Sequence, residues 1–161
     1  SAVTRVADAC NNGGNEQVFN DSEGVLYAEI SAFDNTDTSN RFISILNGTN
    51  LSNGFFLFYG GVTNRIRYQC NTSLGTVNLL TSDFNSQNNN KIVVKYKAND
   101  FALWINGFEV ATNTTVSGTP TGLDNLAFNR SGTDNFYGST KQIQYFDSAL
   151  TDAELKALTT L

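Results

Sequence analysis

Short runs in which apolar and polar residues alternate are the most regular feature of the sequence. In the run 25–30, Leu26 and Ile30 fall on one side, and Tyr27 and Glu29 fall on the other. A period of two residues is typical of a β-strand with one buried face. Comparable runs, and a weaker one at 16–19, recur along the chain: 41–46, 55–59, 65–70, 76–80, 91–96, 101–105, 108–112, 123–128 and 142–146. The pattern predicts an all-β domain.

Two tight turns connect the three strands expected between residues 91 and 112. The first turn is Ala98-Asn99-Asp100 and the second is Asn106-Gly107. Asn-Gly is the preferred pair for a type I′ turn because both residues accept a positive φ. The three strands are therefore expected to pair as a meander in which Leu103 faces the core and Trp104 faces away from it.

The last residues have a helical pattern instead. Thr151 followed three residues later by Glu154 is a capping box, which predicts where the helix begins. Leu155 and Leu158 then give the short helix one apolar edge. We expect this edge to lie on the sheets.

Composition agrees with one all-β domain over residues 1–161. Charged residues make up only 16% of the chain, and Asn, Thr, Ser and Gly supply most of the polarity. The net charge is −5, and the ten basic residues are scattered, so the sequence predicts no nucleic-acid partner. No apolar run approaches the roughly 20 residues of a membrane span, so membrane insertion is not expected.

Two segments of this pattern carry a family resemblance. The segment 95–108, with Leu103-Trp104-Ile105-Asn106-Gly107, resembles a hairpin of the concanavalin A-like lectin/glucanase superfamily, especially its laminin-G-like and pentraxin-like branch. The segment 136–155 is similar to the closing strand and capped helix of the same branch. The resemblance implies an antiparallel two-sheet jelly-roll β-sandwich with a short C-terminal helix. It also implies a face that binds glycans, in some relatives beside a structural calcium ion.

A narrower resemblance concerns the setting of the domain. Thr4 to Asp8, Glu23-Gly24 and Ala149 to Thr151 resemble parts of jelly-roll modules in bacteriophage structural and tail-fibre proteins. This resemblance implies an extracellular or virion-surface location. It also implies a glycan or polysaccharide as the partner, or other virion subunits and copies of the same chain.

Calcium is a candidate cofactor through the resemblance alone. The branch often has Asp at the position of Gln142, and a neutral amide there weakens the assignment. Asp8 and Asp124 are candidate oxygen ligands, but calcium takes six to eight oxygens and the sequence indicates no complete set. The metal site is therefore left unassigned.

The two cysteines, Cys10 and Cys70, leave two alternatives open, a disulfide bond or two free thiols. The chain has no histidine, which excludes the nucleophile–base pairs and most of the zinc sites that depend on one.

The sequence favours a domain without catalytic activity. Glucanases of this superfamily place two carboxylates on one strand in the pattern Glu-x-Asp-x-x-Glu, and the chain lacks this pattern. A polysaccharide lyase would instead need a tyrosine base beside an arginine. Tyr59, Tyr68, Arg65 and Arg67 share one predicted hairpin and are the alternative for such a site. The competing interpretation has Tyr68 in the core and both arginines in solvent.

A ligand site is predicted around Trp104, because a sugar ring stacks on an outward aromatic surface. Lys95 lies on the neighbouring strand with matching parity, and Tyr27 and Glu29 lie on an outward face. Further candidate residues are Arg65 and Arg67, which could form bidentate bonds with acidic sugars. In the alternative interpretation a loop or a partner subunit covers Trp104, and the domain has a purely structural role in a virion or another assembly.

Overall fold

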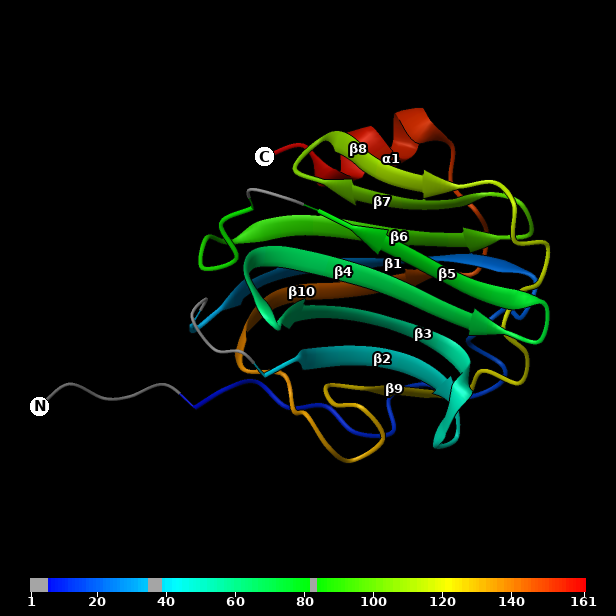
Figure 1. The fold of residues 1–161 in the computed structure, drawn as a ribbon, viewed down its shortest axis with the longest axis horizontal. Helices are drawn as coiled ribbons and strands as arrows, with labels where there is room; N and C mark the ends of the chain where they lie inside the picture. Colours follow the sequence, from blue (N-terminus) through cyan, green and yellow to red (C-terminus); the bar gives the residue numbers. More distant parts are fainter. Residues whose placement is uncertain (1–5, 35–38, 82–83) are drawn as a thin grey trace, which may run out of the picture.

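Ten strands form two five-stranded antiparallel sheets in residues 6–34, 39–81 and 84–161, the part of the chain that this computed structural model describes (Figure 1). The strands and the helix are β1 (Glu23–Ala32), β2 (Arg41–Asn47), β3 (Asn50–Gly60), β4 (Val62–Thr72), β5 (Gly75–Leu80), β6 (Asn90–Lys97), β7 (Phe101–Ile105), β8 (Phe108–Asn113), β9 (Asn125–Ala127), β10 (Gly138–Phe146) and α1 (Asp152–Thr159). The predicted two-sheet sandwich with a short C-terminal helix is confirmed.

The two sheets lie face to face, one in front of the other in Figure 1. The front sheet has the strand order β5-β4-β3-β2-β9, and the back sheet has the order β10-β1-β6-β7-β8. The central strand of the back sheet, β6, pairs with β1, so residues near the start of the chain pair with residues in its second half.

The core lies between the sheets and follows the predicted alternation. The side chains of Leu26 on β1, Leu103 on β7 and Tyr68 on β4 are fully buried there. Burial of each large apolar side chain contributes about 1.5–3 kcal/mol to the free energy of unfolding. The Tyr68 hydroxyl donates a hydrogen bond to the Lys95 carbonyl at 3.2 Å, so the buried polar atom of this residue is satisfied.

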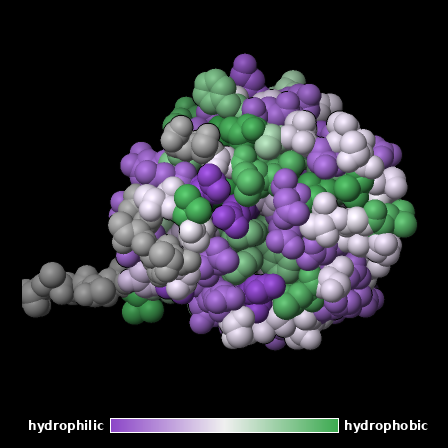
Figure 2. All heavy atoms as spheres, in the orientation of Figure 1, coloured by the Kyte–Doolittle hydropathy of each residue, from purple (hydrophilic) through white to green (hydrophobic). Residues whose placement is uncertain are grey.

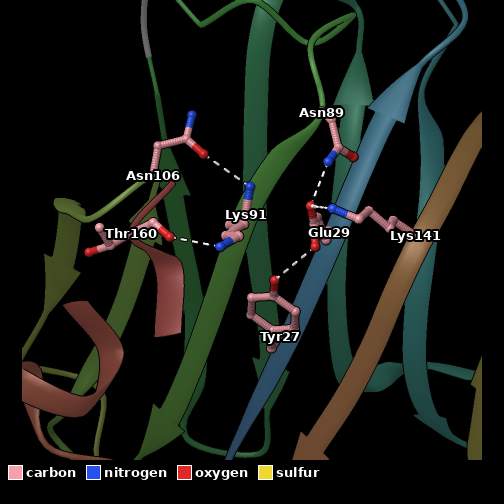
Figure 3. Close-up of polar contacts among 7 residues, drawn as sticks. All are labelled: Tyr27, Glu29, Asn89, Lys91, Asn106, Lys141 and Thr160. Atoms are coloured by element: carbon pink, nitrogen blue, oxygen red, sulfur yellow. Dashed lines mark hydrogen bonds and ion pairs between the residues drawn. The ribbon is translucent and has the colours of Figure 1, made fainter. Parts of the chain in front are cut away.

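The predicted meander turns also have the expected geometry. Asn106 and Gly107 have φ values of 51° and 88°, and Asn99 in the preceding turn has φ 61°. The Asn106 side-chain oxygen accepts a hydrogen bond from the Lys91 backbone N–H at 3.0 Å (Figure 3). The turn between β7 and β8 therefore also holds the beginning of β6.

Helix α1 begins with the predicted capping box. The Thr151 hydroxyl accepts a hydrogen bond from the Glu154 N–H at 3.4 Å, and the Glu154 carboxylate accepts one from the Thr151 N–H at 2.8 Å. Leu155 is fully buried against the outer face of the back sheet. No helix in the described part of the chain is long and apolar enough to cross a membrane.

Some predicted elements differ from the structure. Residues 16–19 form a turn, in which the Val18 and Phe19 N–H groups bond to the Asn15 carbonyl, and not a strand. The predicted strand 123–128 is shorter in the structure, where β9 covers Asn125–Ala127, and the N–H groups of Gly122 and Leu123 before it donate to the Asp21 carboxylate. Residues 35–38 lie outside the described residues, as do Thr4 and Arg5 of the segment that resembles bacteriophage modules.

Both cysteines are free thiols in the structure. Cys70 is fully buried in the core, and this burial raises its pKa to about 12. Cys10 is half-buried beside Leu126. Of the two alternatives, the structure has the free thiols, and Cys70 packs as a small apolar residue.

Candidate functional site

Four of the predicted site residues do lie together, on the outer face of the back sheet. The strand register places Tyr27 beside Val93, and Val93 beside Trp104. Glu29 and Lys95 point to the same face. All four predicted residues are buried, however, and none exposes more than 7% of its surface.

The prediction that Trp104 is an exposed ligand platform is wrong. Trp104 belongs to an apolar cluster with Tyr27 and with Leu155 of helix α1, which covers this face. The alternative interpretation, in which Trp104 serves packing, fits the structure, and the covering segment is the chain's own helix. The helix packs here because Leu155 needs an apolar surface, and the aromatic side of β1 and β7 provides one.

Lys95 is also occupied by contacts within the protein. Its ammonium lies 2.7 Å from the Asp100 carboxylate and 3.7 Å from that of Asp152, the first residue of α1. The side chain therefore ties the beginning of the helix to the turn between β6 and β7. It is not available to a sugar.

Glu29 is the centre of a saturated polar cluster beside the helix (Figure 3). Its carboxylate accepts hydrogen bonds from Asn89 Nδ2 at 2.6 Å, Lys141 Nζ at 2.8 Å and the Tyr27 hydroxyl at 3.3 Å. The bond from Lys141 contributes most to lowering the pKa of Glu29, against the opposing effect of burial. Burial and the neighbouring Glu29 charge raise the pKa of Tyr27 to about 12.

This cluster makes stability depend on pH in a predictable direction. Because the pKa of Glu29 is lower in the folded state than its ordinary value of 4.5, its stabilising effect is present above that value. The effect is lost as the pH falls through the lower folded pKa. We expect Glu29→Gln to be less stable than the wild type at pH 7, and the difference to narrow towards about pH 3. Urea unfolding of both proteins at the two pH values measures this difference, and a constant difference would contradict it.

The outer face of the front sheet has a different character. The register aligns Phe42, Phe58 and Arg67 in one row across β2, β3 and β4, and Ser44, Phe56 and Gln69 in the next. The Phe42 and Phe58 rings stack with centroids 4.4 Å apart, and Phe56 meets Phe42 edge-on at 5.7 Å. Figure 2 shows apolar atoms at the centre of this face with hydrophilic atoms around them.

Two guanidinium groups lie over these rings. Arg67 is 5.8 Å from the centroid of Phe58, and Arg130, from the loop after β9, is 5.6 Å from the centroid of Phe42. Between them is a pocket of about 160 Å³. Its lining residues are Asn40, Phe42, Phe56, Phe58, Arg67, Gln69 and Arg130. We call this the arginine pocket.

The arginines of this face have no charged partner within the described part of the chain. The strands of the front sheet carry no Asp, Glu or Lys. Arg65, Arg67 and Arg130 form no ion pair or side-chain hydrogen bond with any described residue. Lys95, Lys97 and Lys141 on the back sheet are by contrast all paired with carboxylates. Positive charge is therefore left uncompensated on one face of an acidic protein.

In the part of the chain that the structure describes, two buried polar atoms of the arginine pocket also have no hydrogen-bond partner. They are Arg67 Nε, a donor, and Asn40 Oδ1, an acceptor. A buried polar atom without a partner costs about 1–3 kcal/mol, more when it is charged. A ligand that offers an acceptor to Arg67 and a donor to Asn40 would remove this cost. A sugar with an acidic group and neighbouring hydroxyl or amide groups has both.

Of the residues that line this pocket, the sequence prediction found Arg67 and missed the others. The available signal was the run Phe55 to Tyr59, which is apolar at every position. On a strand with one face in the core, such a run leaves Phe56 and Phe58 on the other face. An apolar outer face marks either a covered surface or a ligand site.

The alternative lyase site is not formed. Tyr59 and Tyr68 point into the core, whereas Arg65 and Arg67 point to the outer face of the same sheet. The interpretation that Tyr68 lies in the core is confirmed. Arg67 is half-buried over Phe58 and is not fully solvated.

The candidate calcium ligands do not fit a calcium site. Asp8 accepts a hydrogen bond from the Thr140 N–H on β10, and Asp124 accepts one from the Gly48 N–H in the turn between β2 and β3. Each carboxylate therefore fixes a different part of the backbone. Among the residues that the structure describes, no three carboxylate, cysteine or histidine side chains are grouped closely enough to hold a metal ion.

Two stacked antiparallel sheets, with a helix on one outer face and a polar, aromatic-floored pocket on the other, define a lectin-like sandwich. The sequence model of the concanavalin A-like lectin/glucanases superfamily matches residues 14–156, and the chain belongs to this family. No curated protein sequence matches the chain.

Several solved structures share the whole fold. The CBM40 of the Ruminococcus gnavus IT-sialidase, bound to α2,3 sialyllactose, is 19% identical with a TM-score of 0.74, and the match covers 98% of this chain and 97% of that one. The leech intramolecular trans-sialidase is 16% identical with a TM-score of 0.70, over 98% of this chain and 27% of that one. Domains LG4-5 of the mouse laminin α1 chain are 13% identical with a TM-score of 0.70, over 91% and 41%.

Proposed function

We propose that this domain is a non-catalytic carbohydrate-binding module that takes a carboxylate-bearing sugar in the arginine pocket. The observation that carries the proposal is the pair of guanidinium groups, Arg67 and Arg130, which lie over a phenylalanine floor and have no charged partner among the described residues. A guanidinium binds a carboxylate through two parallel hydrogen bonds, and the apolar floor strengthens these bonds by excluding water.

The size of the pocket supports recognition of one small group. Closed ligand sites usually measure roughly 300–1,000 Å³. The arginine pocket, at about 160 Å³, is below that range and open to solvent. It suits the acidic end of one sugar, with the rest of the glycan outside. Two similar structures, the CBM40 complexes, carry α2,3 and α2,6 sialyllactose, whose terminal sugar bears a carboxylate.

The lining of the pocket supports binding without hydrolysis. Glycoside hydrolysis requires two carboxyl groups on either side of the scissile bond. Among the described residues, no Asp or Glu lines the arginine pocket. We also propose that this recognition takes place at an extracellular or virion surface. The support for this location is the resemblance of short sequence segments to bacteriophage modules.

The proposal predicts discrimination between a charged and an uncharged glycan. We expect 3′-sialyllactose to bind at least about tenfold more tightly than lactose, because a hydrogen bond to a charged group contributes about 1.5–3 kcal/mol. Isothermal titration calorimetry at low ionic strength measures both affinities. Equal affinities, or a stable oligomer that buries this face and binds neither sugar, would overturn the proposal in favour of a structural role.

A further inference from the structure

Arg65 is a cation of the front face that the arginine pocket does not use. It lies on β4 two residues before Arg67, and Ile66 between them points into the core. Alternation along the strand therefore directs Arg65 and Arg67 to the same face, roughly 7 Å apart along β4. Neither side chain has a carboxylate partner among the described residues.

This arrangement is unfavourable for the free protein. Two like charges on one strand repel each other, and no acidic residue lies on the neighbouring strands of the sheet to compensate them. Within the described part of the chain, no carboxylate compensates the charge of Arg65. The close pair of arginines therefore points to a ligand with more than one anionic group.

The surface beyond the two arginines is polar along the same strands. Gln69 and Asn71 follow Arg67 on the same face of β4, and the Gln69 amide donates to Asn71 Oδ1 at 3.0 Å. Asn78 and Thr76 stand opposite them on β5 and are exposed. Amide and hydroxyl groups of this kind bond to sugar hydroxyls.

From this geometry we infer that the natural ligand is an acidic polysaccharide in which carboxylate-bearing sugars follow one another, with Arg65 and Arg67 each binding the carboxylate of a different unit. The inference rests on the proposed function and specifies its ligand. The chain would run along β4, with one acidic unit in the arginine pocket and the next beside Arg65.

A nucleic acid is the other linear polyanion to be considered, and this surface suits it less. Proteins that bind single strands without sequence preference stack the bases on exposed aromatic rings. Phe42, Phe56 and Phe58 are 2–6% exposed, so these rings form a floor and not a stacking platform.

The test compares galacturonate with its α-1,4-linked oligomers of two to six units by calorimetry. For the wild type we expect affinity to rise on the order of tenfold from the monomer to the trimer, the effect of one further charged hydrogen-bonded contact. Arg65→Gln should bind the monomer as the wild type does and lose this rise. Lys156→Gln, which removes one charge from the exposed helix surface, should keep it.

Each other outcome has a definite meaning. An equal rise with length in Arg65→Gln, or no rise in the wild type, would overturn the polysaccharide inference while sialyllactose binding still supported the proposed function. A wild-type protein that binds none of these sugars, sialyllactose included, would refute the proposed function itself. Tight binding of an oligothymidine that Arg65→Gln abolishes would assign the surface to nucleic acid instead. Melting temperatures of the variants show that each is folded.

Discussion

Replacing Trp104 with alanine is expected to lower the free energy of unfolding by about 3–5 kcal/mol and to leave glycan affinity unchanged. The indole is 93% buried between the back sheet and helix α1, so its removal opens a cavity beside Leu155. The arginine pocket lies on the outer face of the other sheet and has no contact with this cluster. The Trp104→Ala substitution should therefore lower the free energy of unfolding without changing the affinity for glycans.

Circular dichroism in urea measures the loss of stability, because the variant lacks the chain's single tryptophan as a fluorescent probe. Trp104→Phe fills most of the space, should cost less, and provides a folded protein if the alanine variant is too unstable. If the Trp104→Phe variant had normal stability but did not bind sialyllactose, the glycan-binding site would have to be assigned to the back sheet.

The second large effect is expected at Arg67. Replacement with glutamine should weaken the binding of sialyllactose about 10- to 100-fold, because it removes a charge-assisted, bidentate contact. It should not lower stability, since the Arg67 guanidinium forms no ion pair with a described residue and its Nε is already unsatisfied. Arg67→Lys keeps the charge but not the planar fork, so it should recover only part of the affinity.

Calorimetry with sialyllactose and thermal unfolding are the two measurements for this variant. Lys156→Gln is the matched control, since it removes the same charge from the exposed surface of α1 and should bind normally. Retained affinity in Arg67→Gln would exclude the arginine pocket as the binding site. A large loss of stability instead would mean that the guanidinium holds Phe58 in place.

The sequence predicted most of the fold because the alternation of apolar and polar residues directly indicates which side of a strand is buried. Leu26, Leu103 and Tyr68 lie in the core as expected, and the Asn106-Gly107 turn and the Thr151 capping box depend on local chemistry alone. The turn at 16–19 was mistaken for a strand, because four residues are too few to establish a period.

The site was harder to predict because alternation does not show what covers the outer side of a sheet. Trp104 and Phe58 are both on outer faces, yet the first lies beneath a helix and the second beneath an arginine side chain. Only the three-dimensional register brings Arg67 beside Phe58, and only the path of a distant loop brings Arg130 over Phe42.

The separation of the two faces has a consequence for how such a domain can diversify. Gln69, Thr76 and Asn78 project from the front sheet without entering the core, so their replacement changes the outer surface with little effect on folding. The apolar cluster between the back sheet and its helix does not include these positions. A library randomised at these three residues would thus sample new glycan specificities on a constant scaffold.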